Sequence, residues 1–146
     1  MSHACKYDSP TTRLQFWGRK IGGLDPNLAI VLAFEPFLTN MFSHGSESAY
    51  PPDRSRVLFP TSVSFMFSNT SLDDIVVKGL RSYSDIVTAA AIADGQHLSH
   101  AAVYPNYALF DTPLEDIYGA NLPRLRAIKM AVDPNDVMGL AGGFKL

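Results

Sequence analysis

The sequence has one cysteine and little charge of either sign. Its 146 residues include 12 Lys or Arg and 14 Asp or Glu, which give a formal net charge of −2. Because Cys5 is the single cysteine, an internal disulfide is excluded and a reducing compartment is indicated. No run of Lys or Arg occurs, so neither nucleic acid nor an anionic membrane is expected as a partner.

Long apolar runs are also absent. The longest uninterrupted one, residues 28–34, is much shorter than the about 20 residues that a membrane-spanning helix needs. Residues 1–8 lack the apolar core of a secretory signal. Hydrophobic residues nevertheless make up 47% of the chain, which suffices for a buried core and excludes a disordered chain. We therefore expect a soluble, cytoplasmic protein with a single domain, residues 1–146, that begins with a loose leader at residues 1–12.

Short apolar and alternating segments predict strands. Residues 28–34 form a compact apolar run that is typical of a buried strand. In residues 60–67, apolar side chains alternate with serines, which predicts a strand with one drier face. A third strand is expected at residues 101–107.

Apolar residues spaced by three and four predict helices. The longest such pattern covers residues 72–93, with Ser71 in a capping position and Gly95 as the stop. Shorter helices are expected at residues 113–118 and after Asn121, which has the side chain of a helix cap. This order of elements predicts an α+β fold, a two-layer sandwich with a mostly antiparallel sheet and helices packed on one face.

Motifs for metals and phosphates are lacking. His97 and His100 lie three residues apart, but no further ligand follows at a matching interval. The glycines of residues 18–23 fit neither a dinucleotide-binding turn nor a phosphate-binding loop. We therefore expect no metal site and no cofactor-binding residues in this chain.

Three motifs in the last third of the chain carry the clearest functional signal. They are Tyr-Pro-Asn-Tyr at residues 104–107, Tyr-Gly-Ala-Asn-Leu-Pro-Arg-Leu at residues 118–125, and Asp-Pro at residues 133–134, ahead of a Gly-Gly-Phe-Lys-Leu end. In order and spacing they resemble the C-terminal signature of the berberine-bridge-type FAD-linked oxidoreductases, fungal members in particular. The resemblance implies that residues 13–100 are part of that family's substrate domain and that residues 101–146 are its berberine-like C-terminal motif.

The resemblance also points to site residues. A tyrosine of the first motif often acts as a base in that family, which implies Tyr104 and Tyr107 as catalytic residues and Asn106 as a substrate-binding polar group. A phenol is a useful base only beside a hydrogen-bonded or positive neighbour. The alternative is that both tyrosines are strand residues with buried rings and satisfied hydroxyls. Aromatic side chains expected to shape an apolar substrate are Phe34, Phe42, Phe65 and Phe67.

Three functions stay open at this point. The first, which we favour, is a flavin-free cyclase or isomerase of specialised-metabolite biosynthesis that acts on a polyketide- or terpene-like small molecule. The second is one half of a split or truncated FAD-dependent oxidoreductase, with FAD held by a separate chain, because the family's FAD-binding portion is not recognised here. The third is a non-catalytic interaction module.

A homodimer is expected as well. In the family, the last helix and the tail pack against the flavin domain. Without that cover, apolar side chains of this region would be exposed, and exposed apolar patches usually bind a partner. The side chains concerned are Leu122, Leu125, Met138, Leu140 and Phe144.

Overall fold

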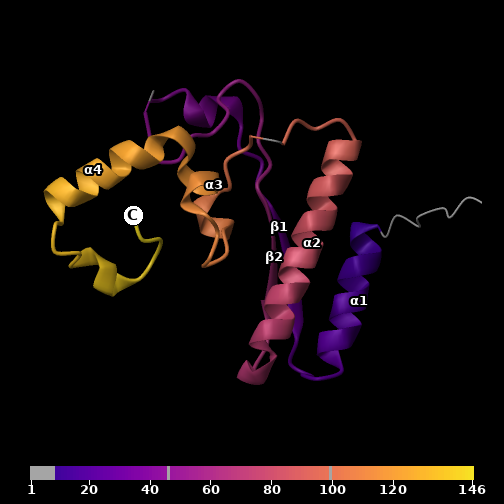
Figure 1. Ribbon diagram of the computed structural model, residues 1–146. Coiled ribbons are helices and arrows are strands. Elements are labelled where there is room, and N and C mark those ends of the chain that lie inside the picture. The colour runs from indigo at the N-terminus through magenta and orange to yellow at the C-terminus, as the bar shows by residue number, and fades with distance from the viewer. Residues whose placement is uncertain (1–8, 46, 99) are drawn as a thin grey trace, which may run out of the picture. The chain divides into compact units, whose positions relative to one another are not determined.

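The computed structural model describes residues 9–45, 47–98 and 100–146 (Figure 1). Its α-helices are α1 (Pro10–Gly22), α2 (Asp73–Ala93), α3 (Leu114–Tyr118) and α4 (Leu122–Val132). Two strands, β1 (Ala29–Phe34) and β2 (Thr61–Met66), form an antiparallel sheet. The fold is therefore α+β, as predicted.

The chain forms two compact units. Unit 1 consists of the described residues of 1–33 and 62–99, and unit 2 of those of 34–61 and 100–146. Each unit is thus built from two separate stretches of sequence. The single domain expected from the sequence stays a prediction.

Unit 1 has one hydrophobic core between its helices and its strands. Trp17 and Ile21 from α1, Phe65 from β2, and Val76 from α2 are buried together with Leu72. Helices α1 and α2 pack against each other, and α2 brings a glycine to that contact. A Cβ atom at Gly79 would lie 3.2 Å from the ring of Trp17. The absence of a side chain at Gly79 therefore lets the two helices approach closely.

A buried carboxylate joins two turns of unit 1. Asp25, with 2% of its surface exposed, follows α1, and its Oδ2 accepts hydrogen bonds from the backbone N–H groups of Ser68 at 2.6 Å and Asn69 at 3.0 Å. Its Oδ1 accepts one from the N–H of Asn27 at 2.8 Å. These backbone donors hold the pKa of Asp25 below its ordinary value of 3.8, against the opposing effect of burial. The charged form of Asp25 thus ties the turn after α1 to the turn before α2.

The predicted helices and the first two strands are confirmed, with local differences. Helix α2 is preceded by a 3-10 turn at Thr70–Leu72. The side-chain cap of this turn is Asn69 rather than Ser71, because the Asn69 side chain accepts a hydrogen bond from the N–H of Ser71 at 3.1 Å. Helix α1 begins at Pro10, within the segment expected to be a loose leader, with Ser9 as its cap. Residues 1–8, including Cys5, lie outside the described residues.

Two expectations about strands are wrong. Residues 101–107 form no strand, because Pro105 lacks an N–H and opens a 3-10 turn at Pro105–Tyr107. The N–H of Val103 donates instead to the carbonyl of Asp116 at 2.8 Å. Strand β1 is not buried either: Val31, Leu32 and Phe34 are exposed, because among the described residues only β2 pairs with it.

Among the described residues, no helix combines the length and apolar character needed to cross a membrane.

The core of unit 2 is smaller than that of unit 1. It includes the buried side chains of Ile117 in α3 and Leu122 at the start of α4. An antiparallel bridge between Phe37 and Leu58, with backbone hydrogen bonds of 2.7 and 3.0 Å, fixes the position of Phe37 in the same unit.

Candidate functional site

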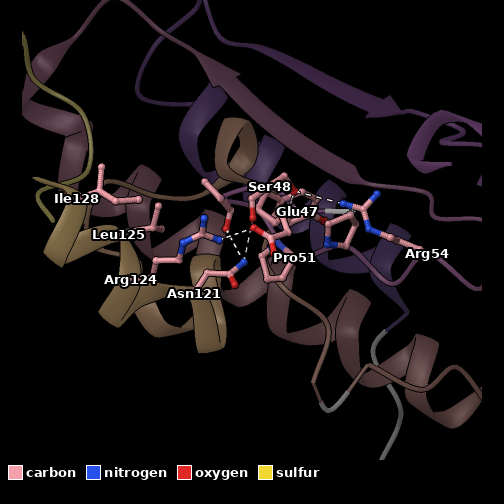
Figure 2. A pocket seen from close by; sticks show the side chains of 11 residues that line it. Glu47, Ser48, Pro51, Arg54, Asn121, Arg124, Leu125 and Ile128 are labelled. Atoms are coloured by element: carbon pink, nitrogen blue, oxygen red, sulfur yellow. Dashed lines mark hydrogen bonds and ion pairs between the residues drawn. The ribbon is translucent and has the colours of Figure 1, made fainter. Parts of the chain in front are cut away.

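Unit 2 contains a cavity of about 510 Å³ (Figure 2). This volume lies in the usual range for small-molecule sites. Two segments far apart in the sequence line it, a loop at residues 47–54 and the beginning of α4. The lining residues are Glu47, Ser48, Ala49, Tyr50, Pro51, Pro52, Arg54, Asn121, Arg124, Leu125 and Ile128.

Polar side chains join the two segments. The amide of Asn121 donates hydrogen bonds to the carbonyls of Ser48 at 2.9 Å and Ala49 at 3.2 Å. Next to it, Nη1 of Arg124 lies 2.5 Å from Oε2 of Glu47, in an ion pair that Figure 2 shows from close by. Asn121 was expected to cap α4, but its side chain makes no capping bond. It holds the loop in place instead, and so gives the cavity its second wall.

An aromatic cluster lies beside the cavity. We define it as Phe37, Phe42, Tyr50, Tyr104 and Tyr107. The ring of Tyr104 is edge-on to the rings of Phe37, Tyr50 and Tyr107, with centroids 5.3, 5.7 and 5.3 Å away. This is a favoured geometry for aromatic pairs. Tyr50 also lines the cavity, so the cluster and the cavity share one residue.

The hydroxyl of Tyr104 has a polar partner from its own turn. Nδ2 of Asn106 donates a hydrogen bond to the phenol oxygen of Tyr104 at 2.9 Å. The 3-10 turn at Pro105–Tyr107 makes this contact between residues two apart in the sequence. Because the amide uses the acceptor side of the oxygen, the phenol O–H stays available as a donor to another group.

Residues 103–141 match a protein-family model described as Berberine and berberine like. This segment is berberine-like. The match confirms the predicted family for that part of the chain, and it contains Tyr104, Asn106, Tyr107 and Arg124. Comparison with curated proteins and with solved structures gives no match.

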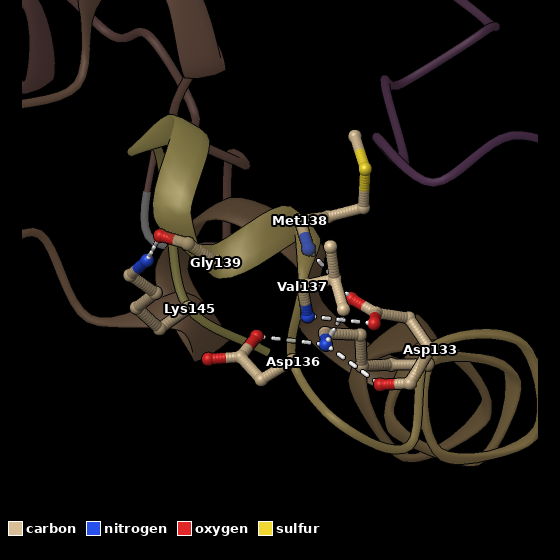
Figure 3. Close-up of polar contacts among 7 residues, drawn as sticks. Asp133, Asp136, Val137, Met138, Gly139 and Lys145 are labelled. Carbon is tan, nitrogen blue, oxygen red and sulfur yellow. Dashed lines mark hydrogen bonds and ion pairs between the residues drawn. The ribbon is translucent and has the colours of Figure 1, made fainter.

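The Asp-Pro motif near the end of the berberine-like segment has a structural role (Figure 3). The carboxylate of Asp133 accepts hydrogen bonds from the N–H groups of Val137 at 2.8 Å and Met138 at 3.0 Å. Lys129 Nζ lies 2.7 Å from Asp133 and 2.8 Å from Asp136. The ammonium of Lys129 holds the pKa of both carboxyls below their ordinary values, and they in turn raise the pKa of Lys129. These contacts fix the turn that follows α4.

Tyr50 differs chemically from its neighbour Tyr104. Its hydroxyl donates a long hydrogen bond, 3.5 Å, to the carbonyl of Ala102. Burial raises the pKa of Tyr50, and the nearby phenol of Tyr104 raises it further because two phenolates would repel each other. Tyr50 is therefore a neutral phenol at ordinary pH, and its single O–H can donate to a ligand in the cavity only by giving up the long contact with Ala102.

The site residues predicted from the sequence separate into two groups. The first group lies in or next to the aromatic cluster, and none of its members lines the cavity. Its members are Tyr104, Tyr107, Asn106 and Phe42. Phe65 and Phe67 belong to the packing of unit 1, where Phe65 is buried in the core. Phe34, at the end of β1, has 65% of its surface exposed. The role of each in binding or catalysis stays a prediction.

Sequence reasoning missed the charged side chains of the cavity and the part played by Tyr50. Arg124 is part of the second berberine-like motif, but its position there is explained equally well by helix packing. Tyr50 and Glu47 stand in an irregular stretch with no periodicity to assign them. Among the residues that the structure describes, no cluster of three or more His, Cys, Asp or Glu could hold a metal ion.

Proposed function

We propose that this chain is a fungal-type, berberine-bridge-like enzyme of specialised metabolism that catalyses a flavin-free cyclisation or isomerisation of an apolar small molecule. A polyketide- or terpene-like substrate would suit the apolar walls made by Pro51, Leu125 and Ile128. The observation that carries the proposal is the ring contact between Tyr50, which lines the cavity, and Tyr104, which does not. The phenol oxygen of Tyr104 accepts a hydrogen bond from Asn106.

The two phenols divide the acid and base roles. Tyr50, whose pKa is raised, remains protonated, and it exchanges its long contact with Ala102 for a hydrogen bond to a carbonyl oxygen of the substrate. The base role falls to Tyr104, the one of the two that belongs to the berberine-like segment. The amide of Asn106 then stabilises the charge on the Tyr104 oxygen. Tyr107 packs edge-on against Tyr104 and keeps the ring in place.

An isomerisation illustrates the balance of the step. Because Tyr104 does not line the cavity, the step requires the ring of Tyr50 to turn aside so that the substrate reaches the Tyr104 oxygen. Tyr104 then removes a proton from the carbon next to the carbonyl of a β,γ-unsaturated ketone, and the C–H electron pair forms the enolate, whose oxygen Tyr50 binds. The same proton returns to the γ-carbon, so that the double bond moves into conjugation and Tyr104 is regenerated. Atoms and electrons balance without an oxidant. A cyclisation starts with the same enolate, which attacks a second carbon of the substrate.

A second candidate follows from the family match. Members of that family use FAD, so residues 103–141 could instead serve an FAD-linked oxidation whose flavin is held by another polypeptide. The starts of the two longest helices among the described residues do not fit the pyrophosphate of a dinucleotide. The longest helix, α2, begins with Asp73 and Asp74, whose charges oppose a phosphate, and the cap of α1 is filled by Ser9. That this chain holds no FAD of its own stays a prediction.

The deciding experiment uses the purified full chain. We expect a colourless protein that converts β,γ-unsaturated ketones to conjugated ketones, followed by ultraviolet absorbance. The Tyr104→Phe variant should lose about 100-fold or more in kcat, the usual contribution of acid–base catalysis. Tyr50→Phe should also lose activity. Tyr83→Phe, which removes a hydroxyl from α2 in unit 1, is the matched control and should keep full activity.

The other functions give different results. A yellow protein with stoichiometric flavin, or turnover only after co-expression with a flavin-binding chain, would favour the FAD-linked oxidation and overturn the proposal. If the native chain shows no turnover, and Tyr104→Phe and Tyr50→Phe change its stability alone, the chain would be an interaction module.

A further inference from the structure

We infer that the cavity of unit 2 binds an organic carboxylate, with its carboxyl group on Arg124 and its apolar body against Leu125 and Ile128. This rests on the proposed function in one respect, because it names the chemical class of ligand for the same cavity. The inference itself is about binding, so it can be tested without turnover.

The charges of the cavity wall favour an anion. Two guanidinium groups, Arg54 and Arg124, face one carboxylate, Glu47, among the described residues that line the cavity. The other lining residues are neutral. The wall thus has an excess of one positive charge, which the carboxylate of a ligand would balance.

Arg54 is engaged in structural contacts. Its Nη1 donates to the carbonyl of Phe42 at 2.5 Å, and its Nη2 lies 3.5 Å from Oγ of Ser48. The guanidinium carbon lies 6.0 Å from the centre of the Phe42 ring, within the range of a cation–π interaction. Arg54 therefore holds the loop and contributes positive charge, with Nη1 and Nη2 each in contact with the protein.

Arg124 is held much less firmly. Its guanidinium pairs with Glu47, and the side chains of the pair are 68% and 71% exposed. Exposed ion pairs contribute little to stability because water screens them and both side chains lose freedom. The contact joins Nη1 to a single oxygen, so the two-pronged geometry that a guanidinium offers to a carboxylate is not used up. A ligand carboxylate can displace Glu47 and accept hydrogen bonds from two guanidinium nitrogens of Arg124.

Glu47 acts as an internal substitute for such a ligand. It places a carboxylate on Arg124 at the edge of the cavity, the position that the ligand's own carboxylate would take (Figure 2). On α4, Ile128 lies one turn beyond Arg124 on the same face. The Cβ atoms of such helix neighbours are about 5–6 Å apart, so a short linker suffices to join the carboxyl group of the ligand to its apolar body. An arylalkanoate such as 3-phenylpropanoate has this shape.

The test is an NMR titration of the full chain with 3-phenylpropanoate and with 3-phenylpropanamide, the uncharged matched probe. We expect saturable shifts of the Leu125 and Ile128 methyl signals with the carboxylate, and binding of the amide about tenfold weaker or more. Arg124→Gln should weaken the carboxylate by a similar factor. Glu47→Gln should tighten it several-fold, because the competing carboxylate is gone. Arg126→Gln, on the same helix but outside the cavity lining, is the control and should bind as the native chain does.

Several results would overturn the inference: no saturable shift up to the solubility of the probe, equal binding of the amide, or weaker binding in Glu47→Gln. Because Glu47 and Arg126 are exposed, circular dichroism is expected to show unchanged folding in their variants. Tyr104→Phe separates this inference from the proposed function. If that variant binds the carboxylate normally but the native chain isomerises no ketone, the proposed function fails alone. If ketone isomerisation is intact and the carboxylate does not bind, the present inference fails alone.

Discussion

The side-chain amide of Asn106 donates a hydrogen bond to the phenol oxygen of Tyr104, two residues before it in the berberine-like segment. Because Asn106 itself is exposed, this contact is not explained by the burial of a polar group in a core. The amide sets the direction in which the Tyr104 hydroxyl can exchange a proton. Asn106 is therefore a positioning residue in the proposed reaction, and its removal can be tested separately from folding.

We expect Asn106→Ala to lower kcat about tenfold with little change in KM, because the lost contact acts on the charged Tyr104 and not on ground-state binding. Asn106→Asp should be at least as harmful, since its carboxylate accepts a hydrogen bond from the phenol and opposes ionisation. Steady-state kinetics on the ketone probe measure both. Asn135→Ala, an exposed asparagine outside the site, is the control. A rise in KM at constant kcat would contradict the assigned role.

Unit 1 should lose stability in acid through Asp25. The pKa of Asp25 is lowered in the folded state, so its contribution is complete above the ordinary value of 3.8 and is lost as the pH falls through the lowered folded value. We expect Asp25→Asn to reduce the free energy of unfolding at pH 7, and the difference from the native chain to shrink toward about pH 3. Urea denaturation followed by circular dichroism across this range measures it. Asp85→Asn, on the exposed side of α2, should show no such convergence.

The close contact of α1 and α2 should not tolerate a branched side chain at Gly79. A Cβ atom at this position would lie 3.2 Å from the Trp17 ring, so Gly79→Val should overpack the core and cost about 1–3 kcal/mol in the free energy of unfolding. Gly79→Ala should cost less, because alanine favours the helix and adds only the Cβ. Ala90→Val, at an exposed position of α2, corrects for the helix propensity of valine. Equal effects of Gly79→Val and Ala90→Val would show that Trp17 is not in contact.

We propose that the chain self-associates through its C-terminal apolar side chains. Of the residues expected to drive a homodimer, Leu122 is buried and Leu125 lines the cavity, whereas Met138 and Leu140 are exposed, Leu140 to 90%. Light scattering at high concentration should give the mass of a dimer, and Leu140→Glu should return it to a monomer. Lys145→Glu changes charge nearby without removing apolar surface. A monomeric native chain would refute the proposal.

Local patterns predicted the elements whose residues are close in sequence. The spacing of apolar residues in α2 and the alternation in β2 follow directly from helix and strand geometry. The predicted strand at residues 101–107 failed because Pro105 turns the chain, although the tyrosines around it have the composition of a strand. The aromatic cluster was partly predicted, since the family resemblance drew attention to Tyr104, Asn106 and Tyr107.

Long-range contacts could not be predicted in the same way. Asn121 and Ser48 are 73 residues apart, and Asp25 and Ser68 are 43 apart. No local period in the sequence reports such pairs, because each depends on how distant turns meet in the folded chain. The cavity, which exists only where residues 47–54 meet the start of α4, belongs to this class.

Each of the two units is built from two separate stretches of sequence, and this limits how the polypeptide can be shortened. Residues 34–61 belong to unit 2, and they supply the loop that Asn121 and Arg124 of the same unit contact. A peptide that begins at residue 100 would retain the family match and yet lack one wall of its cavity. On a ribosome, likewise, the loop emerges long before α4 exists to receive it. Neither unit can be produced by truncating the chain at one position.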